Sequence, residues 1–570
     1  MRRTRIAALA VWALGAALLL GTPPAQAADA KATGSQPFVT VSFAGYDQLV
    51  KSVGLVGKLA GNPELAGMLQ MPIQMMVGED VVKSLDKSKP WGLVVKPGAG
   101  ANDFIVQAFV PGKDVKVLVA ALKKADLEAK EGEGGVFEIQ LQAGAPAGAL
   151  FVKQGSGGWT ILANKKEALA EIPATPETLL AGLNQKYLAA VSLAVKNVPE
   201  STRQQLMMPL MFAFQMSQQR RLPGESDEQA ALRKKATDEA MQRLTATIND
   251  LDTLLVGINV DEKANTAYLD IAITAKAGTE TARKIGQTGD LKSNFAGLIQ
   301  PGATASLQVT AKIDPADTAQ LKTNLAALRS SAMAELEKQG LSEEQLKQGK
   351  QVLGDLMDAL EKSVTSGVID VAAMLKLEAG KTSLVAGGQV AEGAKLESAL
   401  KQLIEQVGKD EPELAKAIKL NAEEYSGVRF HVLTLPTAQL GEAAEGLSKM
   451  FGEKVSVIVG TADTSLYLAL GQDPARDLKQ AIDQAKGQAG KTVPPSQFIV
   501  AATPIVRFAG AVGGAEVKPV VDRLLKGLEG AAGKDRVRMT TTPIPNGSQT
   551  RLELEEGLLK LLGSLPTLGE

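Results

Sequence analysis

The chain has 570 residues, with 62 Lys and Arg against 63 Asp and Glu, one His and no Cys. Its composition is 45% hydrophobic and 22% charged, which is ordinary for globular proteins, and the length predicts roughly two to four domains or two large ones. The absence of Cys excludes cysteine nucleophiles, disulfides, thiolate zinc and iron–sulfur clusters, and a single His excludes a zincin motif. Aromatic residues make up only 4%, so there are few stacking platforms for sugars or bases.

The first 27 residues have the pattern of a cleaved signal peptide. Three Arg residues precede an apolar run from Ile6 to Leu20, and Ala25-Gln26-Ala27 supplies a small-x-small cleavage site. The run is shorter than the roughly 20 residues that a membrane-spanning helix needs. We therefore expect cleavage after Ala27, a flexible N-terminus over 28–36, and an exported protein, periplasmic or secreted, with no membrane span after signal cleavage.

Export without Cys implies that core size alone stabilises the fold. Loss of the three signal-peptide Arg leaves 59 basic against 63 acidic side chains, a net charge of −4. Because the two signs are mixed along the chain, neither nucleic acid nor an anionic membrane surface is an evident electrostatic partner.

Two stretches of the chain share one order of predicted elements, although few of their residues are identical. Period-two alternation predicts strands at 38–43, 91–95, 103–110, 136–141, 150–154, 159–163, 187–195, 253–260 and 266–275 in the first stretch. The second stretch has 305–312, 368–377, 382–390, 428–435, 454–460, 465–470, 497–503, 536–542 and 550–555. Helices are expected at 47–59, 114–125 and from about 165, matched by 316–328, 394–407 and from about 474.

A Gly/Pro turn at Gly297 to Pro301 divides these stretches into units 37–296 and 302–570. Short strands joined largely by tight turns favour antiparallel sheets. The predicted fold class is α+β, with two tandem repeated units, each a mainly antiparallel sheet with helices packed on one face.

Methionine is concentrated in two helical segments of unit 1. One is a predicted insertion at about 199–251 that the second unit lacks, and the other precedes Trp91. The residues are Met207, Met208, Met211 and Met216 in the insertion, and Met68, Met71, Met75 and Met76 before Trp91. Thioether side chains often fill an irregular core, but they also suit a surface that contacts varied hydrophobic guests or a partner helix. Cu(I) ligation is a third alternative, which no nearby His or Cys strengthens.

The catalytic motifs in the sequence are incomplete, so we assign no catalytic, cofactor-binding or metal-ligating residue. His431 lies in the strand 428–435, where alternation predicts a half-exposed side chain, and no G-x-S-x-G elbow accompanies it. The triplets at 380–382 and 490–492 read Gly-Lys-Thr but lack the first glycine of a phosphate loop. Ser84-x-x-Lys87 has the spacing of a penicillin-binding nucleophile without the companion motifs.

Three short motifs carry a family resemblance: Pro90-Trp91-Gly92, Gly158-Trp159, and the run from Asn197 to Arg203 that opens the long helix. Through them the chain, from Phe38 onward, resembles a group of uncharacterised exported proteins of planctomycete-type bacteria. The resemblance implies an exported compartment and brings no activity, cofactor or substrate. Trp91 and Trp159 each follow a turn and begin a strand, so we expect both to be structural.

These observations favour an exported, non-catalytic envelope protein that binds or scaffolds. Its hydrophobic ligand or protein partner would contact the Met-rich helices of unit 1. The alternative is a secreted hydrolase whose carboxylate, Ser or Lys site cannot be identified from sequence.

Overall fold

The computed structural model describes residues 36–64, 67, 79–100, 103–124, 127–141, 148–219, 227–338, 342–410, 415–439, 441, 444–531 and 533–564. The predicted signal peptide and nearly all of 28–36 lie outside these residues. The chain divides into two compact units, with unit 1 extending to Arg283 and including Pro545–Gln549, and unit 2 comprising Lys284–Ile544 and the residues from Thr550 onward. The predicted boundary at Gly297 to Pro301 therefore falls inside unit 2.

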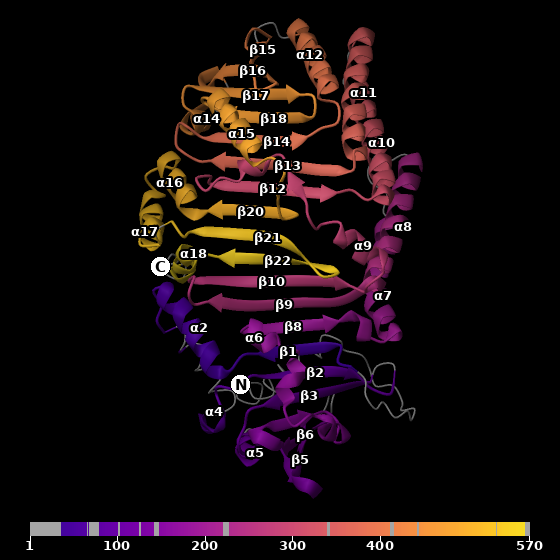
Figure 1. The fold of residues 1–570 in the computed structure, drawn as a ribbon, viewed down its shortest axis with the longest axis vertical. Helices are drawn as coiled ribbons and strands as arrows, with labels where there is room; N and C mark the ends of the chain where they lie inside the picture. The colour runs from indigo at the N-terminus through magenta and orange to yellow at the C-terminus, as the bar shows by residue number, and fades with distance from the viewer. Residues whose placement is uncertain are drawn as a thin grey trace. The chain divides into compact units, whose positions relative to one another are not determined.

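Unit 1 contributes ten strands that pair antiparallel within its described residues (Figure 1). Its strands are β1 Val39–Phe43, β2 Trp91–Pro97, β3 Phe104–Val110, β4 Ala129–Glu131, β5 Val136–Gln140, β6 Ala149–Gln154, β7 Thr160–Ala163, β8 Ala189–Ala194, β9 Leu251–Asp261 and β10 Thr266–Ala275. The hydrogen-bonded order is β4-β5-β6-β7-β3-β2-β1-β8-β9-β10.

The helices of unit 1 connect these strands. They are α2 Tyr46–Leu59, α4 Glu79–Ser84, α5 Val115–Lys124, α6 Leu183–Lys186, α7 Glu200–Gln219 and α8 Asp227–Asp250, and α9 Glu280–Gly286 follows at the division between units. The helix predicted from about residue 165 is only a short 3-10 segment, η3 Glu167–Glu171. Pro173 follows closely and cannot continue a helix, which explains the error.

Unit 2 contains ten further strands that pair antiparallel. Its strands are β12 Ala305–Lys312, β13 Val368–Lys376, β14 Ser383–Gln389, β15 Ile418–Tyr425, β16 Val428–Pro436, β17 Lys454–Ala462, β18 Ser465–Gly471, β20 Ser496–Ala501, β21 Arg536–Ile544 and β22 Gly547–Leu554. The order is β15-β16-β17-β18-β14-β13-β12-β20-β21-β22, with β21 and β22 forming a hairpin (Figure 1). A separate pair joins β11 Lys292–Ser293 to β19 Lys491–Thr492.

The helices of unit 2 are longer on average. They are α10 Pro315–Lys338, α11 Glu343–Thr365, α12 Gly393–Asp410, α14 Ala444–Phe451, α15 Pro474–Gln488, α16 Ala502–Val512, α17 Lys518–Leu528 and α18 Glu556–Ser564. Ser342 begins α11 with a capping box, in which its hydroxyl accepts from the Gln345 backbone N–H. Asn546 adopts a left-handed φ of 53° in the β21–β22 turn, as the Asn-Gly dipeptide predicts.

The prediction that helices pack on one face of each sheet is wrong. In unit 2, Phe430 packs with α15, while its neighbour His431 contacts α12; adjacent strand residues point to opposite faces. In unit 1, Val152 packs with α5 on one face and Ile161 packs with η3 on the other. The alternation of a strand indicates which of its side chains are apolar, but it does not indicate which helices cover either face of the sheet.

The largest core of unit 2 lies between α15 and the strands that it crosses, β17, β18 and β14 (Figure 1). Leu478 and Ile482 from α15 meet Phe430 and Ile458 from the sheet, and all four are almost fully buried. In unit 1, Trp159 is 2% exposed and meets Phe109 edge-on at 5.6 Å, and Trp91 stacks on Phe43 at 4.2 Å. Both Trp side chains therefore pack against the unit 1 sheet, in agreement with the structural role expected from the sequence.

The α15 core gives a matched test of burial. Leu478→Ala should lower the free energy of unfolding by about 2–5 kcal/mol, because Leu478 is fully buried and its loss leaves a cavity. Leu328→Ala, on the exposed side of α10, should change it by no more than about 0.5 kcal/mol. Urea denaturation of both variants measures the difference. Equal losses would contradict the assignment of this core.

Candidate functional site

Helix α7 exposes a stripe of apolar side chains, which we call the α7 stripe. It consists of Met208, Met211, Phe212 and Met216, and each is more than half exposed. Residues spaced i, i+3, i+4 and i+8 lie on one helical face, so the four form a continuous surface. Met207 is half-buried. Met68, Met71, Met75 and Met76 lie outside the described residues.

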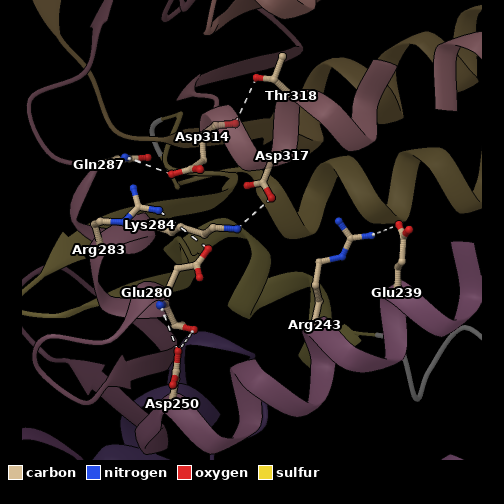
Figure 2. Close-up of polar contacts among 11 residues, drawn as sticks. Glu239, Arg243, Asp250, Glu280, Arg283, Lys284, Gln287, Asp314, Asp317 and Thr318 are labelled. Atoms are coloured by element: carbon tan, nitrogen blue, oxygen red, sulfur yellow. Dashed lines mark hydrogen bonds and ion pairs between the residues drawn. The ribbon is translucent and has the colours of Figure 1, made fainter. Parts of the chain in front are cut away.

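The base of the α7–α8 pair is held by polar contacts at the end of α8. Asp250 accepts hydrogen bonds from the backbone N–H of Thr281 at 3.3 Å and from its hydroxyl at 2.8 Å, which ties α8 to the start of α9 (Figure 2). Lys276 donates to the Asn249 carbonyl at 2.7 Å. Arg243 pairs with Glu239 one turn apart on α8, at 3.8 Å. These contacts tie down the end of α8, the helix in contact with α7.

In unit 2, Figure 2 also shows how α10 begins. Lys284 pairs with Asp317 at 2.9 Å, and the Gln287 amide donates to Asp314 at 3.5 Å. The Thr318 hydroxyl donates to the Asp314 backbone carbonyl at 3.1 Å, within the first turn of α10. These contacts join the segment after α9 to α10 and provide no open, unpaired group.

The one His of the chain is buried in a charged cluster between α12 and the sheet of unit 2, which we call the His431 cluster. Glu397 from α12 receives Arg429 at 2.6 Å and Lys401 at 2.5 Å. His431 Nε2 lies 3.8 Å from the Glu397 carboxylate and 3.2 Å from the Thr461 hydroxyl. The prediction that His431 is half-exposed is wrong, because it is 3% exposed under α12.

A β-bulge determines the protonation form of His431. The β15–β16 register shifts between Lys419 and Glu423, and Asn421 in this interval has a left-handed φ of 47°. The backbone N–H of Asn421 donates to His431 Nδ1 at 3.3 Å. Nδ1 therefore acts as an acceptor, and the proton of the neutral ring belongs on Nε2, where Thr461 can accept it.

The local environment lowers the pKa of His431. Burial favours the neutral ring and is the main cause; the Glu397 carboxylate opposes it, and Lys401 and Arg429 lower the pKa further. Burial raises the pKa of Glu397, but hydrogen bonds from Lys401 and Arg429 outweigh burial and hold it below its ordinary value. Because His431 and Glu397 are buried and already paired, this arrangement serves packing rather than contact with a substrate.

A second buried carboxylate, Asp370 on β13, holds the β11 segment against the sheet of unit 2. It accepts hydrogen bonds from the Ser293 hydroxyl at 2.6 Å, the Thr310 hydroxyl at 3.1 Å and the Asn294 backbone N–H at 2.7 Å. Asp370 is 2% exposed. The three hydrogen bonds to its carboxylate oxygens offset the cost of removing this polar group from water.

The remaining sequence motifs do not assemble catalytic sites. Ser84 donates to the Val81 carbonyl at 2.8 Å, and the Lys87 ammonium lies over the Tyr46 ring at 5.5 Å. Gly380 and Gly490 adopt left-handed φ in turns that precede strands, as expected of loops rather than phosphate cradles.

The described part of the chain contains neither a metal-binding group nor a candidate membrane span. There, no three His, Asp or Glu side chains gather in a group able to hold a metal ion. No helix in the same residues combines the length and hydropathy required to cross a membrane.

Comparison with known proteins gives no relative: the chain matches no protein-family model, no curated protein and no solved structure. The surfaces and clusters above are therefore the basis for a functional proposal.

Three members of the α7 stripe, Met208, Met211 and Met216, are among the Met residues named from the sequence, whereas Phe212 and the His431 cluster are not. The four members of the stripe are neighbours in the sequence, and their helical spacing is visible there. Glu397 and His431 come from elements that meet only in the folded unit. Phe430 and His431 point to opposite faces, as adjacent strand residues do, but no local signal in the sequence shows that α12 covers His431.

The His431 cluster predicts a specific pH dependence of stability. The pKa of His431 is about 6.5 when unfolded and lower when folded, so below pH about 6.5 the unfolded chain binds more protons. The free energy of unfolding should therefore fall as the pH decreases from about 6.5 towards 5. His431→Gln should remove most of this slope, because the chain has no other His.

Urea denaturation at a series of pH values measures both proteins. The loss of stability below pH about 4.3, to which Glu397 contributes through its lowered pKa, should remain in His431→Gln and provides the internal control. An unchanged slope between pH 5 and 6.5 would contradict a buried, neutral His431.

Proposed function

We propose that the protein is an exported, non-catalytic envelope protein that binds or scaffolds a hydrophobic ligand or protein partner through the Met-rich helices of unit 1. The exposure of the α7 stripe is the observation that carries this proposal. Burying four large apolar side chains against a partner would lower the free energy relative to leaving them in water. Flexible thioethers can adjust to apolar partners of different shape.

The spacing of the stripe favours an apolar helix on the partner. An amphipathic helix binds another helix or groove through residues at i, i+3, i+4 and i+7 or i+8, which is the spacing of Met208, Met211, Phe212 and Met216. The resemblance to exported planctomycete-type proteins agrees with an envelope location.

We also infer that the two units are tandem copies of one α+β design. The strand orders of the two sheets correspond one to one, from β4 with β15 at one end to β10 with β22 at the other. Helix α5 and helix α12 each lie between corresponding strands. In this alignment the α7–α8 pair corresponds to α16–α17, so the Met-rich pair is a lengthened connection rather than an added one.

Export provides the first test. The sequence places cleavage after Ala27, so N-terminal sequencing of protein recovered outside the cytoplasm of its native host should begin at Ala28. Replacing Leu18, Leu19 and Leu20 with Asp should interrupt the apolar run and retain the uncleaved chain in the cytoplasm. Recovery of an uncleaved chain outside the cytoplasm would contradict the proposed signal peptide.

The α7 stripe provides the test of binding. We expect the triple variant Met208→Gln, Met211→Gln and Met216→Gln to bind several-fold less 8-anilinonaphthalene-1-sulfonate, because the dye prefers exposed apolar surface. Its free energy of unfolding should change by less than about 0.5 kcal/mol per substitution. Dye titration and urea denaturation measure the two quantities.

A matched control changes exposed apolar residues elsewhere. Leu328→Gln with Leu562→Gln removes two exposed Leu side chains from α10 and α18 and should leave dye binding nearly unchanged. If the Met variant keeps full dye binding but loses ~2 kcal/mol or more of stability, its Met side chains are packing residues and the proposed surface is wrong.

A further inference from the structure

The sheet of unit 2 has an apolar face that the described helices leave exposed. We call it the unit 2 apolar face and define it by Leu307, Ile369, Val371, Phe498, Met539 and Leu552, which are 36–43% exposed. These residues come from five neighbouring strands, β13-β12-β20-β21-β22. Exposed large apolar side chains on adjacent strands form a patch, whereas single exposed residues need no explanation.

Strand pairing puts these side chains on the same face. Leu307 is opposite Phe498, and Phe498 is opposite Met539. The Thr541 and Thr550 hydroxyls meet at 3.0 Å, and the same antiparallel register aligns Met539 with Leu552. The face continues through Leu384 on β14 to Leu468 on β18, which is also exposed.

The two faces of this part of the sheet differ in charge. On the unit 2 apolar face, the alternate positions of the seven strands from β18 to β22 are apolar apart from Ser and Thr, and none is charged. The opposite face carries Arg538, which pairs with Glu555 at 3.6 Å, and the buried Asp370. An uncharged face can meet an identical face without opposing like charges.

We propose that the unit 2 apolar face packs against the same face of a second copy of the chain, which forms a two-layer β-sandwich across a two-fold axis. Two sheets pack face to face at about 10 Å with their strands aligned within about 30°, and apolar side chains fill the space between them. Leu307 and Phe498 lie at the centre of the face and are the main contacts.

The area of the face is sufficient for such a dimer. Seven strands at ~4.8 Å spacing and about seven residues of length at ~3.3 Å give on the order of 750 Å² per copy. Stable protein interfaces bury about 800 Å² per partner. A lipid with a charged headgroup fits less well, because the face has no charged group to pair with it.

Sedimentation velocity of the signal-free chain, 28–570, tests the proposal. The wild-type protein should form a dimer over roughly 1–100 μM, the range in which interfaces of standard size assemble. Leu307→Lys with Phe498→Lys should raise the dissociation constant at least ten-fold, because it places charges in an apolar interface. Leu328→Lys with Leu562→Lys adds the same charge at exposed positions elsewhere and should leave the dimer intact.

A labelling experiment avoids dependence on the folding of the Lys variant. The chain has no Cys, so Leu307→Cys provides a single site for a nitroxide label. The label should be immobile in the dimer, while a label at Leu328→Cys on α10 should be mobile. A monomer at all concentrations, a mobile label at position 307, or a monomer that co-purifies with lipid in native mass spectrometry would overturn the proposal.

This test is independent of the proposed function. It concerns unit 2, whereas the α7 stripe belongs to unit 1. If the protein is a monomer, the dimer proposal fails, but the α7 stripe can still bind a hydrophobic partner. If the Met variant retains full dye binding, the proposed function fails, but the dimer can still form.

Discussion

The alternation of side chains along antiparallel strands is the constraint on which the rest of this structure depends. Each strand presents its odd and even residues to opposite faces, so one sequence must satisfy two environments. In β13, Asp370 is buried and hydrogen-bonded to the β11 segment, while the adjacent Ile369 and Val371 are exposed. The pleat therefore puts Asp370 and the core residues Ala372 and Met374 on one face of β13, and the exposed Ile369 and Val371 on the other.

The face that is apolar at Leu468 continues across β17 to β16, where it carries the His431 cluster under α12. His431, Arg429 and Glu397 lie on the face opposite the Phe430 core, where α12 covers the sheet. Two cations balance one buried carboxylate there, and a bulge supplies a backbone donor to the imidazole. Burial keeps the His431 ring neutral. Protonation of the ring would destabilise the folded chain, because a protonated Nδ1 could no longer accept the hydrogen bond from the Asn421 backbone N–H.

The two units use apolar exposure in different ways. Unit 1 has a helix with exposed Met and Phe side chains, which are flexible or flat. Unit 2 has a sheet face of stiffer β-branched and Leu side chains with Phe498 at the centre, which suits a regular, repeated contact. Exposed apolar patches of this size, on a helix or on a sheet, favour association with another molecule.

The sequence alone determined the strands, because period-two alternation and Gly, Pro and Asn turns are local signals. It predicted the β1 and β12 strands within a residue, and a helical segment at about 199–251, where α7 and α8 lie. It missed β4 and β15, whose exposed charged residues do not alternate as half-buried strands do. Tertiary structure decided that helices cover both faces and that His431 is buried, because coverage depends on elements far apart in the chain. It also decided that Met208 and Leu307 are exposed, since a residue's hydropathy does not specify which neighbour will remove it from water.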